Sequence, residues 1–336
     1  MRFIEVGRFG APEVLTVREG TDPVPEAGQV ALEVSVADVI FLETAIRRGE
    51  AGQWFDVRPP YVPGGGVVGT VTAVGAGVDP SWVGRRVATT AARGSYAERT
   101  LAPADRLAAV PDGLDARTAA ALVHDGATAR SIVTAVAPEP DQWVLVTAAA
   151  GAMGLLLVRM AREAGARVVG AARGARKLEL LRSRGIEGVV DYSEPGWTER
   201  VREAAGGRDP EVVYDGAGGA IGRAAFAITA RGGRFSAHGA PSGDFAEVGR
   251  EEADERGVTL YSLADLHQDG AAATRNIEDV LAAAAAGRIV PVIGRTFPLE
   301  GAAEAHAALE ERTIVGKALL EVSHRRGPDG QTGSPK

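Results

Sequence analysis

Short apolar strands alternate with helical segments through the second half of the chain, and this alternation restricts the possible folds more than any other feature. The strand-like runs are residues 143–147, 167–172, 189–192, 212–215 and 234–238. The stretches between them have the apolar spacing of helices, which is typical of βαβ units with parallel strands. We therefore expect an α/β fold with a doubly wound parallel sheet over residues 122–287.

The junction after the first of these strands is rich in glycine and alanine. It reads Thr147-Ala148-Ala149-Ala150-Gly151-Ala152-Met153-Gly154, and a helical pattern follows over 153–164. Small residues let a backbone approach a pyrophosphate, the helix N-terminus offers free N–H groups, and Gly154 allows close helix packing. A tight turn without a ligand is the alternative, but a dinucleotide fingerprint requires this strand, turn and helix context. The sequence therefore predicts a Rossmann domain that binds a dinucleotide here.

The end of the second strand distinguishes NADH from NADPH. An acidic residue there would hold the ribose hydroxyls and repel a 2′-phosphate. This chain has Arg173, Arg176 and Lys177 instead, with no Asp or Glu among them. These cations are suitable donors for a phosphate, although a solvated basic helix start would look the same. We expect the cofactor to be NADPH.

The first part of the chain has a different texture. Gly/Pro turns separate short β-type runs at residues 30–36, 66–74, 86–88 and 96–101, which predicts a small barrel or sandwich. The segment 289–297 and the strand 317–322 are again β-like, and we expect them to return to this domain. The expected domain boundaries are thus 1–121 with 288–322 for the β-rich domain, 122–287 for the Rossmann domain, and 323–336 for a flexible tail rich in Gly, Pro and charge.

The absence of cysteine is the strongest negative feature. With no cysteine in 336 residues, the chain has no disulfide, thiolate nucleophile, iron–sulfur cluster or cysteine-containing zinc site. The formal charge of -7 comes without a basic block, which argues against nucleic acid as the main partner. No apolar run reaches membrane-spanning length, and the N-terminus lacks a secretory signal pattern. We expect a cytoplasmic protein that acts on a small molecule.

With these motifs, residues 1–322 resemble the zinc-free quinone oxidoreductase (zeta-crystallin-like) branch of the medium-chain dehydrogenase/reductase superfamily. The matching segments are Pro63-Gly64 with Gly69 to Val78, Gly94-Ser95-Tyr96-Ala97-Glu98, Ala119 to Leu122, Gly126-Ala127-Thr128-Ala129, Ala148 to Gly154, Asp191-Tyr192, Val213-Tyr214-Asp215-Gly216, and Ala305 to Glu310 with Gly316 to Leu320. The resemblance implies a GroES-like catalytic domain beside the Rossmann domain, with the nicotinamide in the cleft between them. It also implies a homodimer, and the segment 257–263 is a plausible edge strand for it.

The resemblance also implies which residues contact the cofactor. These are Ala150, Gly151, Met153 and Gly154 at the pyrophosphate, Lys177 and Tyr192 near the adenosine phosphate, and Gly216, His238 and Arg312 elsewhere along the cofactor. Arg173 joins this set on the basis of its charge alone.

Zinc-using relatives hold a catalytic metal with a Cys, a His beside a Glu, and another Cys or Asp. Here the corresponding stretch is Pro63-Gly64-Gly65-Gly66, so we expect no metal site. Without that Lewis acid, alcohol dehydrogenase chemistry is disfavoured, whereas a quinone or an α,β-unsaturated carbonyl needs less activation. The expected activity is NADPH-dependent quinone reduction. The alternatives are a biosynthetic enoyl reductase and a protein that binds NADPH without turnover.

The substrate cleft departs from the family pattern on one side. Ile40 stands where the family commonly has an Asn near the nicotinamide, and Glu43 keeps the acidic character of the family's Asp. Asp38 and Glu43 are five residues apart, so a shared acid/base site is doubtful. We interpret Asp38 as a turn residue and Glu43 as a salt-bridged helix residue.

A second departure is His124-Asp125, where the family has apolar or small residues. An imidazole titrates near neutrality, so His124 is a candidate donor of a proton to a developing oxyanion, with Asp125 in the same cleft. The alternative is that His124 packs under the cofactor and Asp125 pairs locally, because adjacent helical residues point in different directions. The remaining candidates, His267, His306 and His324, have no metal spacing and are interpreted as structural.

Overall fold

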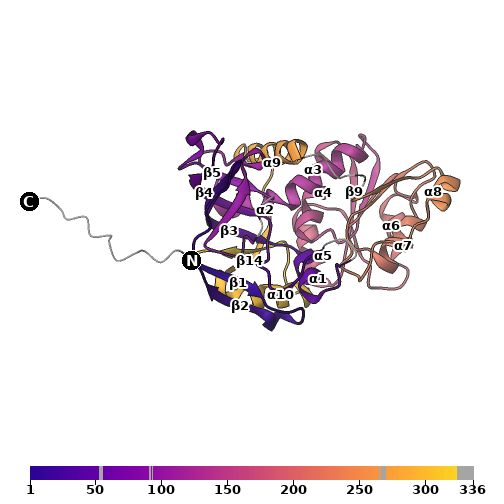
Figure 1. Cartoon of the computed structure of the whole chain (residues 1–336). Coiled ribbons are helices and arrows are strands. Elements are labelled where there is room, and N and C mark those ends of the chain that lie inside the picture. The colour runs from indigo at the N-terminus through magenta and orange to yellow at the C-terminus, as the bar shows by residue number, and fades with distance from the viewer. Residues whose placement is uncertain (53–55, 91, 93, 264, 266–269, 324–336) are drawn as a thin grey trace, which may run out of the picture.

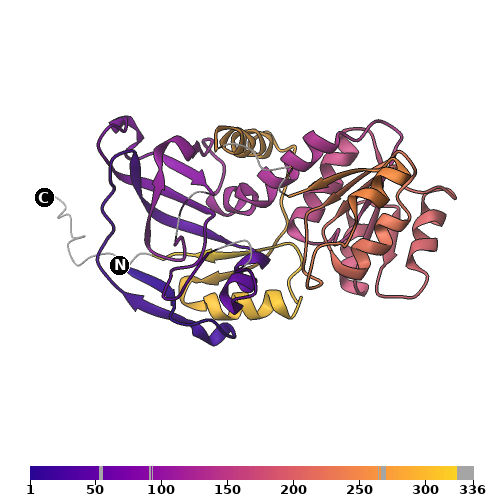
Figure 2. The same ribbon diagram turned by 45° about the vertical axis from the view of Figure 1, so that its right-hand side comes forward.

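The computed structural model describes residues 1–52, 56–90, 92, 94–263, 265 and 270–323. Two sheets of different type dominate it and lie side by side, one β-rich part and one layered α/β part (Figures 1 and 2). The predicted tail falls almost entirely outside the described residues, as do His267 and His324. Within the described ranges, no helix combines the length and the apolar character needed to cross a membrane.

The β-rich part contains a mostly antiparallel sheet in the order β14-β15-β3-β4-β5-β7, with β6 paired to β3. Its strands are β3 (Gln29–Val39), β4 (Val67–Val74), β5 (Arg86–Thr89), β6 (Arg99–Pro103), β7 (Ala108–Ala109), β14 (Ile293–Pro298) and β15 (Lys317–Glu321). A separate antiparallel pair is formed by β1 (Arg2–Val6) and β2 (Leu15–Glu19). Strands from both ends of the sequence thus share one sheet, which confirms the expected return of the C-terminal segment.

The second sheet has six parallel strands in the order β10-β9-β8-β11-β12-β13, the doubly wound order of a Rossmann fold. Its strands are β8 (Trp143–Val146), β9 (Arg167–Ala172), β10 (Gly188–Asp191), β11 (Val212–Asp215), β12 (Arg234–Ala237) and β13 (Thr259–Ser262). The strand predicted from residues 257–263 is β13, and it does lie at the edge of the sheet. The β-rich sheet and the doubly wound parallel sheet that the sequence predicts are therefore both present.

Helices cover both faces of the parallel sheet. Apolar side chains of α3 (Asp125–Val136), α4 (Ala152–Glu163) and α5 (Ala175–Ser183) pack on one face. Those of α6 (Trp197–Ala204), α7 (Gly219–Ala227) and α8 (Arg250–Arg256) pack on the other. The other helices are α1 (Phe41–Arg48), α2 (Ala116–Val123), α9 (Gly270–Ala285) and α10 (Ala302–Glu310), with short 3-10 turns η1 (Pro12–Val14), η2 (Pro80–Trp82), η3 (Ala104–Arg106) and η4 (Leu299–Gly301).

The helices α2 and α9 connect the two parts. Buried side chains of α2 and α9 belong to the same apolar cluster as α3 and α4, and that cluster also includes Val68 of β4 and Leu319 of β15. A continuous apolar core therefore runs from one sheet to the other. The proposed boundaries at 121/122 and 287/288 fall within α2 and just after α9, and they remain predictions.

Candidate functional site

The predicted cofactor residues follow the ends of the parallel strands. Arg173 directly follows β9, Tyr192 follows β10, Gly216 follows β11 and His238 follows β12. Because the carboxyl ends of parallel strands meet at one edge, the fold brings these positions to a common side of the sheet. This edge is where ligands bind in open α/β sheets.

The turn after β8 has the geometry that a close backbone approach requires. Ala148 adopts a left-handed φ of 50°, and Gly151 begins α4 without a side-chain cap. A Cβ on Gly154 would lie 2.8 Å from Ala149 Cα, so only glycine lets the helix lie this close to the turn. The Ala150 carbonyl accepts a hydrogen bond of 3.3 Å from Gly316 N–H, which joins the turn to the start of β15.

Cations gather next to this turn. Burial lowers the pKa of Lys177, and the charges of Arg312, Arg173 and Arg176 lower this pKa further, so the four side chains lie close enough to repel one another. None of the four forms an ion pair within the described ranges. Burial raises the pKa of Tyr192, while Arg173 and Arg312 oppose the rise, so the phenol lies in the same cluster. Such a cluster is stabilised by an anion with several negative oxygens.

Gly216 and His238 form the next part of the edge. A Cβ on Gly216 would lie 3.3 Å from His238 Nε2, so the two residues are neighbours. The Thr147 hydroxyl donates to Asp215 Oδ1 over 2.6 Å and accepts from Gly216 N–H over 3.0 Å, which fixes the backbone between them. Burial lowers the pKa of His238 to about 4, and its ring is therefore neutral near pH 7.

A mostly buried polar cluster of Asp38, His124, Asp125 and Lys317 lies beside the turn from Ala148 to Gly154, which we call the dinucleotide turn. We call the cluster the charged quartet. Asp38 Oδ2 accepts a 2.9 Å hydrogen bond from His124 Nδ1 and a 3.0 Å hydrogen bond from Lys317 Nζ. Lys317 Nζ also donates to Asp125 Oδ2 over 2.6 Å. Lys317 comes directly after Gly316, which contacts the dinucleotide turn.

The charges of the quartet perturb one another. Burial alone would raise the pKa of Asp38, but His124 and Lys317 hold it well below its usual range. Burial opposes protonation of His124, yet the Asp38 carboxylate raises the His124 pKa above its ordinary value. The His124 side chain is 25% exposed, whereas the Asp38 side chain is 1% exposed. The imidazole is thus anchored on its inner side and accessible from outside.

Glu43 stands close to the quartet on α1. Burial and the charge of Asp38 raise the pKa of Glu43 to about 7, although His124 and a backbone hydrogen bond from Gly64 oppose the rise. Within the described ranges Glu43 forms no ion pair, so its interpretation as a salt-bridged residue is wrong. Ile40 is the residue just before α1, next to the end of β3.

Asp38 is not a turn residue, which corrects the second half of that interpretation. It lies in β3, which extends to Val39, and its side chain points into the protein. Sequence reasoning missed Lys317 and set Asp38 aside. A signal existed for Lys317, since a lysine at the start of an otherwise apolar strand needs a buried partner. His124 and Asp125 do not pair with each other, and Asp125 pairs with a residue 192 positions away.

His306 is a packing residue, as interpreted. It is fully buried, and its Nε2 lies 3.2 Å from the Tyr96 hydroxyl. Burial lowers the pKa of His306 to about 3. The part of the chain that the structure describes contains no group of three or more His, Asp or Glu side chains arranged to hold a metal ion.

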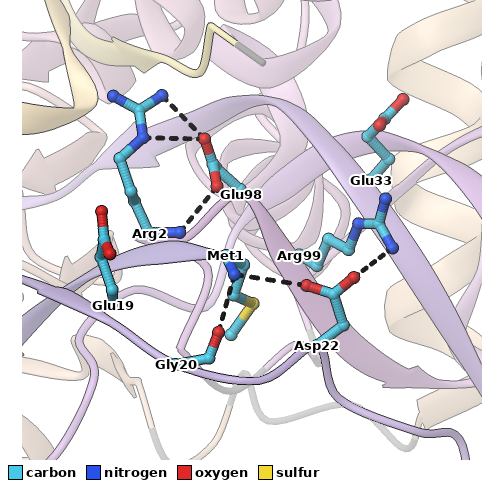
Figure 3. Close-up of a pocket in the computed structure, with 8 residues that line it drawn as sticks. All are labelled: Met1, Arg2, Glu19, Gly20, Asp22, Glu33, Glu98 and Arg99. Carbon is cyan, nitrogen blue, oxygen red and sulfur yellow. Dashed lines mark hydrogen bonds and ion pairs between the residues drawn. The ribbon is translucent and has the colours of Figure 1, made fainter. Parts of the chain in front are cut away.

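A separate cavity of ≈ 350 Å³ opens near the N-terminus, and no residue of the turn after β8 lines it (Figure 3). Its walls are already neutralised by ion pairs: Arg2 with Glu98 at 2.7 Å, and Arg99 with Asp22 at 2.5 Å. The N-terminal amine also contacts Asp22, at 3.4 Å. This cavity contains none of the predicted site residues, and charged side chains make up most of its lining, which does not suit a hydrophobic acceptor.

Two family profiles match the chain. The one described as "Alcohol dehydrogenase GroES-like domain" matches residues 26–112, and the one described as "Zinc-binding dehydrogenase" matches residues 152–279. The second description does not transfer zinc to this chain, because the cysteine ligands are absent and Gly65-Gly66 replaces the His-Glu pair.

Curated relatives match over nearly the whole chain. A 2-haloacrylate reductase from Burkholderia sp is 32% identical over 94% of this chain and 97% of its own length. A human quinone oxidoreductase is 29% identical over 95% of this chain and 97% of its own length.

Solved structures agree with these sequence matches. A mycobacterial protein in complex with NADPH is 34% identical, with a TM-score of 0.87 over 96% of this chain and 100% of that one. The Escherichia coli quinone oxidoreductase in complex with NADPH is 28% identical, with a TM-score of 0.88 over the same shares. The CurK enoyl reductase, at 21% identity and a TM-score of 0.85, shows likeness of fold alone.

Proposed function

Because the chain belongs to the medium-chain dehydrogenase/reductase superfamily, in its quinone oxidoreductase-like branch, we propose that it is an NADPH-dependent reductase of a quinone or a similar electron-poor acceptor. The observation that carries the proposal is the cluster of cations that form no ion pair with any described residue, beside a glycine turn at the carboxyl edge of the parallel sheet. Relatives that share this fold were solved with NADPH. The family and the charge of the site point to the same cofactor.

The residues of the site fit a phosphorylated dinucleotide. Gly151 and Gly154, with Ala150 and Met153, form the turn where the α4 N-terminus offers free N–H groups to a pyrophosphate. Arg173, Lys177 and Arg312 repel one another without an anion, and a 2′-phosphate would neutralise them beside Tyr192. Gly216 and His238 continue the same edge of the sheet.

When bound, NADPH supplies a hydride, and reduction of a quinone or an enone also consumes one proton. His124 is the proposed donor of that proton. Its Nδ1 is bonded to Asp38, whereas Nε2 has no hydrogen-bond partner among the described residues and the ring is partly exposed. Ile40 and Glu43, at the start of α1, are the proposed residues of the substrate cleft, and the pKa of about 7 at Glu43 adds a second titrating group there.

A second candidate acceptor is an α,β-unsaturated carbonyl compound. Similarity to the 2-haloacrylate reductase favours it, because that protein is named for an electron-poor alkene. The quartet fits this chemistry as well, since a proton must reach the enolate that forms after hydride addition. Both candidates therefore need the same donor, and only the shape of the acceptor differs.

Steady-state NADPH oxidation with a panel of quinones and a panel of enones tests the proposal. We expect acceleration with at least one panel, and the ratio of kcat/KM between the two panels decides the acceptor class. Tight NADPH binding by calorimetry without acceptor reduction would instead support a binding protein without turnover. No binding of either reduced nicotinamide would refute the cofactor site.

The proposal includes a homodimer in the cytoplasm. The edge strand β13 supports it, because an exposed edge has unpaired backbone groups that a second copy can satisfy across a two-fold axis. Light scattering after size exclusion is expected to give twice the chain mass. A monomer at micromolar concentration, or recovery of the native protein in a membrane or secreted fraction, would contradict this part.

A further inference from the structure

Two donors share one oxygen at the centre of the charged quartet. His124 Nδ1 and Lys317 Nζ both donate to Asp38 Oδ2, at 2.9 Å and 3.0 Å. A carboxylate oxygen that accepts from an ammonium gives less of its charge to an imidazolium beside it. The strength of the His124–Asp38 interaction therefore depends on Lys317.

Lys317 is held firmly in this place. Its side chain is 2% exposed, and its ammonium is fixed between Asp38 and Asp125. Its backbone N–H donates to the Val292 carbonyl over 2.8 Å, and the preceding Gly316 N–H donates to Ala150. The backbone bonds fix the start of β15, and the ammonium cannot leave this position without losing its contacts with the two carboxylates.

The charges of the quartet balance only when His124 is protonated. Asp38 and Asp125 contribute two negative charges and Lys317 one positive charge, so an imidazolium brings the sum to zero. A buried cluster with an uncompensated charge is costly, which favours the imidazolium. Lys317 opposes this, because it is itself a positive neighbour of His124.

We propose that Lys317 is a positioning residue that weakens the stabilisation of the His124 imidazolium by Asp38, so that His124 releases its Nε2 proton to the reduced substrate near neutral pH. In that step the His124 Nε2–H bond breaks, an O–H bond forms on the substrate oxyanion, and water returns a proton to the neutral imidazole. The final transfer rests on the proposed function, whereas the effect of Lys317 on His124 does not.

Other ionisable groups lie near the charged quartet. Glu43 of α1 lies near Asp38 and His124, and its partial ionisation near pH 7 adds a negative charge. Burial raises the pKa of Tyr96 well above its usual range, and the charges of Glu43 and Asp38 raise it further, so the phenol stays neutral. The His124 titration must therefore be compared between variants that keep both groups.

The first test is an NMR titration of the histidine side chains in the full-length protein without added nucleotide. His124→Gln assigns the His124 resonance among the five histidines of the chain. We expect Lys317→Met to raise the His124 pKa by about one unit or more, and Asp38→Asn to lower it by a similar amount, because a charge within about 4–6 Å has effects of this size. Lys317→Arg keeps the charge and should stay near the wild-type value.

Shifts of opposite sign separate this role from a merely structural one, since general loosening of the site would move both variants toward the value of a free imidazole. Arg47→Met is the matched control, because Arg47 is a fully buried cation whose partner is Glu310 and which does not touch the quartet. Its removal should leave the His124 pKa unchanged. If Lys317→Met does not fold, Lys317→Met with Asp125→Asn removes one charge of each sign and should still raise the pKa, though by less.

The pH profile of kcat provides the second readout. Its alkaline limb should move up in Lys317→Met and down in Asp38→Asn, in step with the NMR values. An unchanged His124 pKa in both the single and the double Lys317 variant would overturn the inference. If the NMR shifts appear but no acceptor is reduced, the role of Lys317 stands and the proposed function fails.

Discussion

Gly66 is the position where the smallest substitution should have the largest effect on the site. A Cβ added there would lie 2.5 Å from His124 Nδ1 and 2.6 Å from Asp38 Cγ. Carbon atoms in favourable contact are about 3.5–4.0 Å apart, so Gly66→Ala must push the two side chains by about 1 Å. Such a displacement is enough to break their 2.9 Å hydrogen bond.

The expected cost follows from that bond. A hydrogen bond to a charged group contributes about 1.5–3 kcal/mol, and overpacking alone costs about 1–3 kcal/mol. We expect Gly66→Ala to lower the free energy of unfolding by about 2.5–6 kcal/mol at pH 6, because the two contributions add. The His124 pKa should fall toward its ordinary value, because the substitution separates the imidazole from Asp38.

The pH dependence of the stability loss in Gly66→Ala shows whether the broken His124–Asp38 hydrogen bond causes it. The folded-state pKa of His124 is raised, so its stabilising contribution is complete below the unfolded pKa and is lost as the pH rises through the folded pKa. The difference between wild type and Gly66→Ala should therefore shrink from pH 6 to pH 9, leaving only the steric part. Urea denaturation at both pH values measures it.

Gly65→Ala is the matched control. A Cβ on Gly65 would lie 3.4 Å from the Thr90 carbonyl oxygen and 3.7 Å from His124 Cε1, so the change requires little movement. Neither Gly65 nor Gly66 has a positive φ, so backbone strain does not separate the two variants. Equal stabilities for the two variants, or a Gly66→Ala effect that does not vary with pH, would refute the reasoning.

The other predictions concern the cofactor, the cleft and the core. Replacing Arg173 and Lys177 together by alanine should weaken NADPH binding by about 1.5–3 kcal/mol, roughly 10- to 100-fold in Kd, without weakening NADH binding. Calorimetry with both nucleotides measures the two affinities, and equal losses would contradict a role of these cations at the extra phosphate. Glu43→Gln should remove an ionisation near pH 7 from the pH profile of kcat, since the pKa of Glu43 is raised to about 7; a profile that keeps it would exclude Glu43 as its source. Because burial lowers the pKa of His306 to about 3, its contribution to stability is present above about pH 6.5 and is lost as the pH falls, by up to ~1.4 kcal/mol per unit. Urea denaturation of His306→Gln should show a shallower acid loss than wild type, and an unchanged slope would mean that other groups cause it.

The sequence by itself determined the parts of this protein that depend on local pattern. Strand and helix periodicity is a short-range property, so the parallel sheet and the β13 edge were predictable from runs of a few residues. The glycine turn at Ala150 to Gly154 and the cations near Lys177 were predictable for the same reason, because a helix start after a strand has a known place in the fold.

Only the tertiary structure decided the composition of the charged quartet. Lys317 and Asp38 are 279 residues apart in the chain, and they meet because the C-terminal strand β15 pairs with β3. The orientation of Asp38 depends on the continuation of β3 through this residue to Val39. Alternate residues of a strand point to opposite faces of the sheet, so the place of Asp38 in the strand decides its face. Burial opposes the charged forms of Asp38, His124 and Lys317, and their charges together shift the three pKa values the other way. This proximity is a property of the whole fold.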